Sequence, residues 1–193
     1  GTPSLPMDIR YIDTDLYGLS ASRRIGAVTL EAEAGYNDVD HLMDNYGLRT
    51  APPPARQRRN HTTGRGTNFA LGARLPVAGA ELALGVDGRL ATHDAVITNP
   101  NNAAFRIDNF VDVERDLLGL YAEWRTAAGA GEWELGVRYN TVSTDAGEVS
   151  ASGMMGMMAA AAGDLADRFN AADRSLDFGN VDVVAGYRRS LSP

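Results

Sequence analysis

Apolar and polar residues alternate along seven stretches of the chain, which is the period of a β-strand with one apolar face. In residues 28–37, for example, valine, leucine, alanine and tyrosine alternate with threonine, glutamate, glycine and asparagine. The seven stretches are residues 17–22, 28–37, 68–75, 81–87, 118–125, 133–140 and 181–188. We therefore predict seven strands of roughly 9–11 residues, the length with which a tilted strand crosses a bilayer.

The connections between these strands alternate in length. The sequence predicts short turns at Arg23–Ala27, Pro76–Ala80 and Thr126–Glu132, and long segments at Asp38–Gly64, Leu90–Glu114 and Thr141–Gly179. Short turns on one side and long loops on the other are typical of outer-membrane barrels. We expect an all-β fold, an antiparallel up-and-down meander that is a partial slice of a large transmembrane β-barrel. A soluble, half-buried antiparallel sheet also alternates and remains an alternative.

Aromatic and charged residues allow more detailed predictions for the two faces of the expected sheet. Interfacial aromatic girdles are predicted on the apolar face, with Trp124 and Trp133 beside one short turn. Tyr36, Tyr139 and Tyr187 are predicted to form the girdle at the other strand ends. On the polar face we expect two cross-strand ion pairs, Arg74 with Glu81 and Arg125 with Glu134.

Glycines recur on the polar face of the expected strands. They are Gly35, Gly72, Gly85, Gly119, Gly136 and Gly186. Small residues there either leave room for something inside a barrel or ease strand curvature, and the sequence does not choose between these. An alanine-rich stretch at residues 154–168 is expected to form one short helix within its loop.

Composition narrows the classes of function. The 193 residues carry a formal net charge of −7, which argues against a nucleic-acid partner. The absence of cysteine excludes disulfides, thiolate metal sites and cysteine nucleophiles. No hydrolase or nucleotide-binding motif occurs, so we expect no enzyme and no bound cofactor. The first residues lack the pattern of a signal peptide, and the sequence does not begin with methionine. We therefore expect an internal piece of a longer polypeptide.

Methionine and histidine residues in the expected loops are candidate metal ligands. The set consists of His41, Met43, Met154, Met155, Met157 and Met158. Thioether and imidazole ligands select copper, above all Cu(I), which makes a copper ion the candidate transported ligand. The alternative is that the methionines fill gaps in loop packing.

The stretch LPMDIRYIDTDLYGLSASRRIGAVTLEAEAGYNDVDHLMDNYGLR resembles barrel segments of TonB-dependent outer-membrane receptors. So do LGVDGRLATHD, ITNPNNAAFRIDNF, ERDLLGLYAEW and ELGVRYN, and the loop methionines and histidines bring the likeness nearest to the copper-type receptors. The resemblance implies a barrel of about 22 strands whose lumen is closed by a plug. Residues 1–193 would then belong to the barrel domain, with the plug domain and the C-terminal part of the barrel outside them.

The resemblance also implies location in the outer membrane of a Gram-negative cell. The partners would be outer-membrane lipid, the protein's own plug domain, the TonB complex and a metal or metal-chelate substrate. Alternatives of the same fold are a siderophore or vitamin receptor and a passive porin. A membrane-embedded hydrolase is disfavoured because no serine motif accompanies the histidines.

Overall fold

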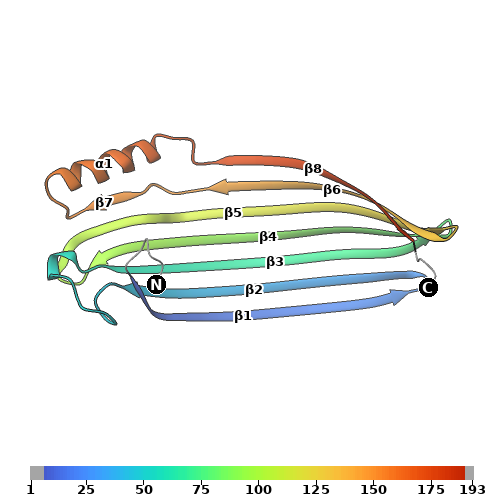
Figure 1. Cartoon of the computed structure of the whole chain (residues 1–193), viewed down its shortest axis with the longest axis horizontal. Coiled ribbons are helices and arrows are strands. Elements are labelled where there is room, and N and C mark those ends of the chain that lie inside the picture. The colour runs from blue at the N-terminus through green and yellow to red at the C-terminus, as the bar shows by residue number, and fades with distance from the viewer. Residues whose placement is uncertain (1–6, 190–193) are drawn as a thin grey trace.

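The structure, a computed structural model, describes residues 7–189 and consists of a long curved antiparallel sheet with one helix at one end (Figure 1). The strands are β1 (Asp8–Ile25), β2 (Val28–Asp44), β3 (Arg59–Val77), β4 (Ala80–Asn99), β5 (Asn102–Ala128), β6 (Gly131–Asp145), β7 (Ser150–Ser152) and β8 (Leu176–Arg189). A 3-10 turn, η1 (Pro54–Arg56), and a helix, α1 (Met157–Asn170), lie in the connections.

Each of the seven long strands pairs with the next in the order β1-β2-β3-β4-β5-β6-β8. The short β7 lies off this path and pairs with residues 106–108 of β5. The expected all-β meander with successive antiparallel pairing is therefore confirmed, as is a helix in the alanine-rich stretch. No helix among residues 7–189 combines the length and apolar character needed to cross a bilayer.

The expected strand length is wrong, because the seven long strands contain 14 to 27 residues. Two of the three expected long loops contain much more strand than expected: about half of the segment 38–64, and all but two residues of the segment 90–114. The segment 38–64 leaves only residues 45–58 outside β2 and β3, and β4 and β5 are joined by a tight turn at residues 100–101. In these extensions both faces carry polar residues, so the period-2 signal fades although the backbone pairing continues.

The three turns opposite the loops lie together at one end of the sheet, on the right in Figure 1. Each connects its strands through two residues, 26–27, 78–79 and 129–130. Gly26, Gly79 and Gly129 have φ values of 62°, 81° and 63°, and Ala78 has 51°. Such left-handed conformations match the twist of paired strands and favour glycine, which is why these turns contain it.

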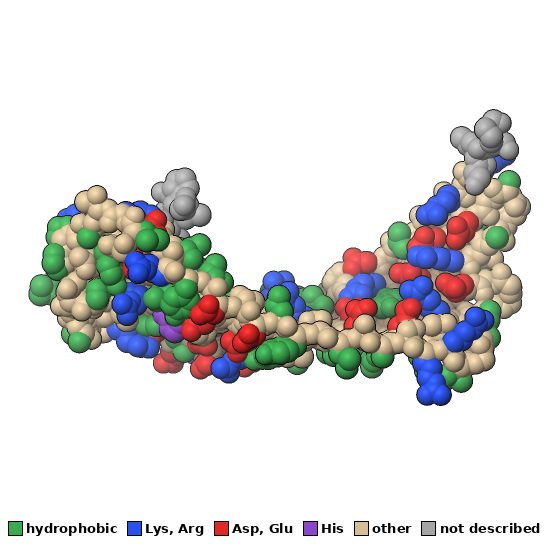
Figure 2. Space-filling view, turned by 90° about the horizontal axis from the view of Figure 1, so that it is seen from below, with side chains coloured by type: hydrophobic (Ala, Val, Ile, Leu, Met, Phe, Trp, Pro, Cys, Tyr) green, Lys and Arg blue, Asp and Glu red, His purple; other side chains and the backbone are tan. Residues whose placement is uncertain are grey.

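The sheet has one apolar and one polar face, and it lacks an ordinary core. Among the described residues no large side chain is fully buried, whereas Leu19 is 73% and Val183 78% exposed. Figure 2 shows the thin sheet with hydrophobic side chains along its lower edge and charged side chains over the face that curves upward. A soluble sheet would need a second layer over this apolar face, and residues 7–189 provide none.

The aromatic residues of the apolar face gather at two levels. Tyr17 and Tyr36 lie together toward the loop end, with ring centroids 6.3 Å apart. At the turn end Trp133 packs on Tyr187 at 4.8 Å, because the two residues are direct partners across β6 and β8. The placement of Tyr187 in the loop-end girdle was wrong, since β8 runs toward the turns.

Candidate functional site

Four side chains form a square on the polar face at the loop end of the sheet. On β2 and β3, His41 lies opposite Thr62 and Met43 lies opposite Asn60. Direct partners in an antiparallel pair project from the same face, as do residues two apart on one strand. The pairing of β2 with β3 runs without a register shift, so this square shares its face with Glu31 at the turn end.

Apolar residues flank the square on both sides. On β1, Ile12 lies opposite His41 and Ile9 lies opposite Met43. On β4, Ala95, which is 4% exposed, lies opposite Thr62, and Ile97 lies opposite Asn60. The imidazole and thioether therefore stand between hydrophobic neighbours, which lowers the local polarity around them.

Two polar atoms of the square are buried without a hydrogen-bond partner among the described residues. They are Nε2 of His41 and Oδ1 of Asn60. A buried polar atom without a partner costs about 1–3 kcal/mol, so native structures rarely retain one without a use. An imidazole nitrogen without a hydrogen-bond partner, two residues along the strand from a thioether on the same face, offers a donor set that suits Cu(I). Residues 7–189 contain no group of three or more His, Asp or Glu residues that could hold a metal ion.

The other two histidines have different surroundings. His61 lies on the opposite face from His41, and its Nε2 is 2.7 Å from Oδ1 of Asp40. His93 lies on the same face as His41 and packs edge-on against Phe110, with ring centroids 5.5 Å apart. Of the three histidines, His41 is the one with a buried, unpartnered ring nitrogen in the described chain.

The methionine block lies elsewhere at the loop end. Met154 and Met155 precede α1, while Met157 and Met158 form its first turn. Met155, Met157 and Met158 are 89%, 90% and 69% exposed. The helix packs against β7, which pairs with β5, and β5 is separated from β2 by β3 and β4. The structure therefore brings His41 together with Met43 but places the methionine block apart from them.

Two arginines anchor the loops at this end. Arg49 binds Asp8, and this hydrogen bond holds the pKa of the Asp8 carboxyl below its usual value. Arg58 stacks 3.8 Å from the ring centre of Phe105, and burial lowers its pKa. These contacts tie the 45–58 connection to β1 and β5.

Asp108 of β5 holds β7 in place. It accepts hydrogen bonds from Arg106 at 2.7 Å and from Ser150 at 2.6 Å. Burial alone would raise the pKa of Asp108, but the two hydrogen bonds outweigh it and the pKa lies below its usual value.

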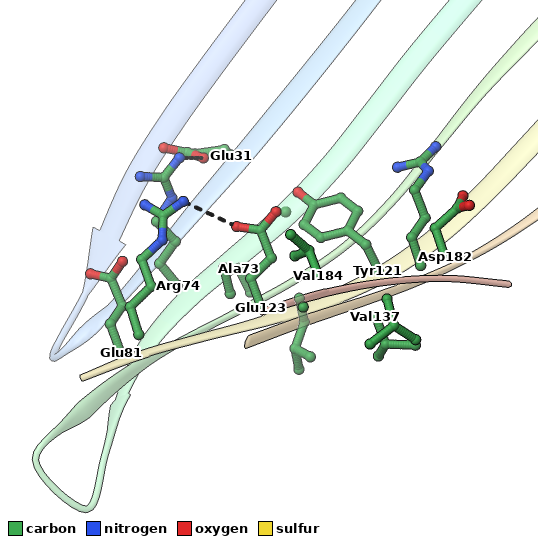
Figure 3. Close-up of a pocket in the computed structure, with 16 residues that line it drawn as sticks. Glu31, Ala73, Arg74, Glu81, Tyr121, Glu123, Val137, Asp182 and Val184 are labelled. Atoms are coloured by element: carbon green, nitrogen blue, oxygen red, sulfur yellow. Dashed lines mark hydrogen bonds and ion pairs between the residues drawn. The ribbon is translucent and has the colours of Figure 1, made fainter. Parts of the chain in front are cut away.

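A second feature of the polar face is a hollow of about 430 Å³ at the turn end (Figure 3). Its charged and aromatic lining consists of Glu31, Arg74, Glu81, Tyr121, Glu123, Arg125, Arg138 and Asp182. These residues come from β2, β3, β4, β5, β6 and β8, so only the assembled sheet creates the hollow.

Ion pairs cross the floor of the hollow. Arg125 binds Glu134 at 3.0 Å and Glu123 at 3.4 Å, which confirms the expected pair of Arg125 with Glu134. The expected pair of Arg74 with Glu81 is wrong, because Arg74 lies opposite Ala83 and binds Glu31 of β2 at 3.3 Å. Both arginines nevertheless lie on the polar face, so the assignment of faces is correct.

One ion pair was not predicted from the sequence, because its two residues lie on strands that are separated by a third strand. Arg138 of β6 reaches over β5 and binds both oxygens of Asp87 on β4, at 2.7 and 2.8 Å. The residue of β5 between them is Gly119, the direct partner of Asp87. A Cβ atom at Gly119 would collide with the Arg138 guanidinium. The sequence carries no local signal of this pair, because Gly119 lies between the two residues only once β4, β5 and β6 are in register.

Some of the polar-face glycines, unlike Gly72 and Gly186, admit side chains of the sheet itself. Gly85 makes room for the Tyr121 ring and Gly35 for the Asn68 amide, as Gly119 does for Arg138. This use differs from both expectations, an open lumen and mere curvature, because neighbouring side chains fill the space.

Comparisons with known proteins agree with the fold. No family model matches the chain, and no curated protein matches it either. Among solved structures the chain is similar to the copper transporter OprC, with a TM-score of 0.72 and 22% sequence identity. The match covers 97% of this chain and 30% of that one, so the chain spans less than a third of its length. At this identity the likeness shows a shared fold.

Proposed function

We propose that this chain is part of the wall of an outer-membrane barrel that takes up copper, with His41 and Met43 as its copper ligands in the wall. The observation that carries the proposal is the buried, unpartnered Nε2 of His41 on the polar face. The one-sided apolar sheet and the fold shared with a copper transporter support it. We interpret the polar face as the inside of the barrel and the loop end as the outer opening.

The chemistry follows from the donor set. Cu(I) accepts few ligands and prefers sulfur and imidazole, so His41 and Met43 need only one or two further ligands to bind it. We expect these from a part of the polypeptide outside residues 1–193, such as a plug that fills the lumen. Release would follow when that part moves and takes its ligands away, a step that we assign to TonB.

The methionine block has a separate role in this proposal. The thioethers of Met155, Met157 and Met158, just before and at the start of α1, are 69–90% exposed and gain little from packing. We propose that Met154, Met155, Met157 and Met158 collect copper at the outer opening and that His41 with Met43 bind it deeper in the wall. A receptor for an organic chelate would instead present aromatic and arginine side chains to its substrate. Arg58 is engaged elsewhere, because it stacks on the ring of Phe105.

The test compares two histidines on opposite faces of one sheet. The intact receptor is purified with His41→Ala, Met43→Leu or His61→Ala, loaded with Cu(I), and its bound copper is measured by mass spectrometry after desalting. We expect the first two variants to lose the copper ion bound in the wall, since each removes one of its few ligands. His61→Ala should bind copper like the unmodified receptor. Equal copper in all variants would contradict the assignment.

A further inference from the structure

The segment that carries the methionine block lies at the loop end of the sheet, between β7 and α1 (Figure 1). Gly153 anchors one end of it, because this residue packs so closely on β5 that a Cβ atom there would collide with the backbone of Ala104. Gly156 has a φ of 63°, and nothing beyond its neighbours in the chain lies within 4 Å of where its Cβ atom would be. The segment is therefore fixed at its base and surrounded by open space where α1 begins.

The six methionines of the chain differ in how far water reaches them. Met155, Met157 and Met158 are largely exposed, each by 69% or more. Met43 is partly buried between its partners on β1 and β3, and Met7 is 8% exposed. An oxidant dissolved in water therefore reaches the thioethers of the block before it reaches the thioether in the wall.

Exposed thioethers react with peroxides to form sulfoxides. One oxygen atom of hydrogen peroxide forms a bond to sulfur, the O–O bond breaks, and the other oxygen leaves as water. The sulfur loses two electrons, which the peroxide gains. The product presents a hard oxygen in place of a soft sulfur, and Cu(I) prefers soft ligands. Oxidation therefore removes the property for which the block suits copper.

We propose that Met155, Met157 and Met158 form a reversible oxidation site for peroxides, at which sulfoxide formation stops copper capture at the outer opening. The inference rests on the proposed function, because it takes the block as the collector of copper for His41 and Met43. The shielded Met43 keeps its thioether, so copper already bound in the wall is retained while capture of further copper stops. Methionine sulfoxide reductases reverse the reaction and restore the capture.

The experiment measures oxidation and copper loading on the same protein. The intact receptor is treated with hydrogen peroxide, freed of it by desalting, and loaded anaerobically with limiting Cu(I). Trypsin, which cleaves after arginine, separates the fragment 25–49 with Met43 from the fragment 139–168 with the block, so mass spectrometry counts the oxygen atoms gained by each. The matched control is a variant with leucine in place of the four methionines of residues 154–158.

We expect oxygen to be gained by the fragment 139–168 and not by the fragment 25–49. The rate of copper loading should fall to that of the leucine variant, which peroxide should not slow further. The two methionine sulfoxide reductases, one for each sulfoxide epimer, should restore the original rate.

Two results would overturn the oxidation site while leaving copper binding in the wall intact. One is an oxidised block with an unchanged loading rate, and the other is an equal slowing of the leucine variant by peroxide. The untreated proteins test the proposed function separately. If the leucine variant loads copper as fast as the unmodified receptor before any peroxide is added, the block collects no copper, and the oxidation site fails together with that role.

Discussion

The contact between Arg138 and Asp87 exists only because residue 119 is glycine. Replacing Gly119 with alanine places a Cβ atom in the space that the Arg138 guanidinium occupies. The guanidinium must then shift, and because it holds both oxygens of Asp87 we expect it to lose at least one of the two hydrogen bonds. We therefore expect Gly119→Ala to destabilise the barrel, although alanine is a small substitution at an extended position.

The magnitude follows from how exposed this pair is. The side chains of Arg138 and Asp87 are 33% and 29% exposed, between a surface pair and a buried one. Exposed pairs contribute about 0.2–1 kcal/mol, and breaking a buried pair costs about 3–5 kcal/mol. Allowing for screening at this exposure, we expect Gly119→Ala to lower the free energy of unfolding by about 1–3 kcal/mol.

The assay is urea-induced unfolding of the barrel from lipid vesicles, followed by the fluorescence of Trp124 and Trp133. Gly186→Ala is the matched control, because its added Cβ would lie at an ordinary 3.7 Å from Glu134 on the same face. In an Arg138→Met background the cost of Gly119→Ala should largely disappear. An effect equal to that of Gly186→Ala, or one that persists without Arg138, would refute the reasoning.

Three further predictions concern the faces, the methionines and the rim. If the apolar face meets lipid, as proposed, Leu120→Arg on that face should destabilise the folded barrel by about 2–4 kcal/mol in vesicle unfolding, whereas Leu117→Arg, on the polar face, should cost far less. Equal costs would contradict the proposal that the apolar face meets lipid. Replacing the four methionines of residues 154–158 with leucine should reduce copper uptake at limiting copper concentrations in cells, while copper bound at His41 in the purified receptor stays unchanged. Folding lowers the pKa of Asp108, so the ionised carboxylate stabilises the folded state. Its contribution to holding β7 is complete above the ordinary aspartate pKa of about 4. The contribution is lost as the pH falls through the lowered pKa of the folded state. Hydrogen exchange of β7, corrected for intrinsic rates, should show this loss in acid, and Asp108→Asn should remove the pH dependence.

Sequence alone determined the architecture and the faces. Alternation in stretches such as residues 28–37 and 133–140 specified strands with one apolar face, because a period of two places every second side chain on the same side. The turns at residues 26–27, 78–79 and 129–130 lie within the three turn segments predicted from glycine. These are local properties, and each can be read from a few neighbouring residues. The same alternation placed Arg74 and Arg125 on the polar face correctly.

The tertiary structure decided where strands end and which side chains meet. Strand extensions beyond the apolar belt lose their alternation, so pairing between β4 and β5 up to residue 99 left no local signal. Arg138 reaches Asp87, 51 residues away, through a gap at Gly119 that exists only once three strands are in register. The separation of the methionine block from His41 is likewise a matter of strand order, since β3 and β4 lie between β2 and β5. A sequence lists candidate donors and charges, but their distances are fixed by register, which depends on every strand of the sheet together.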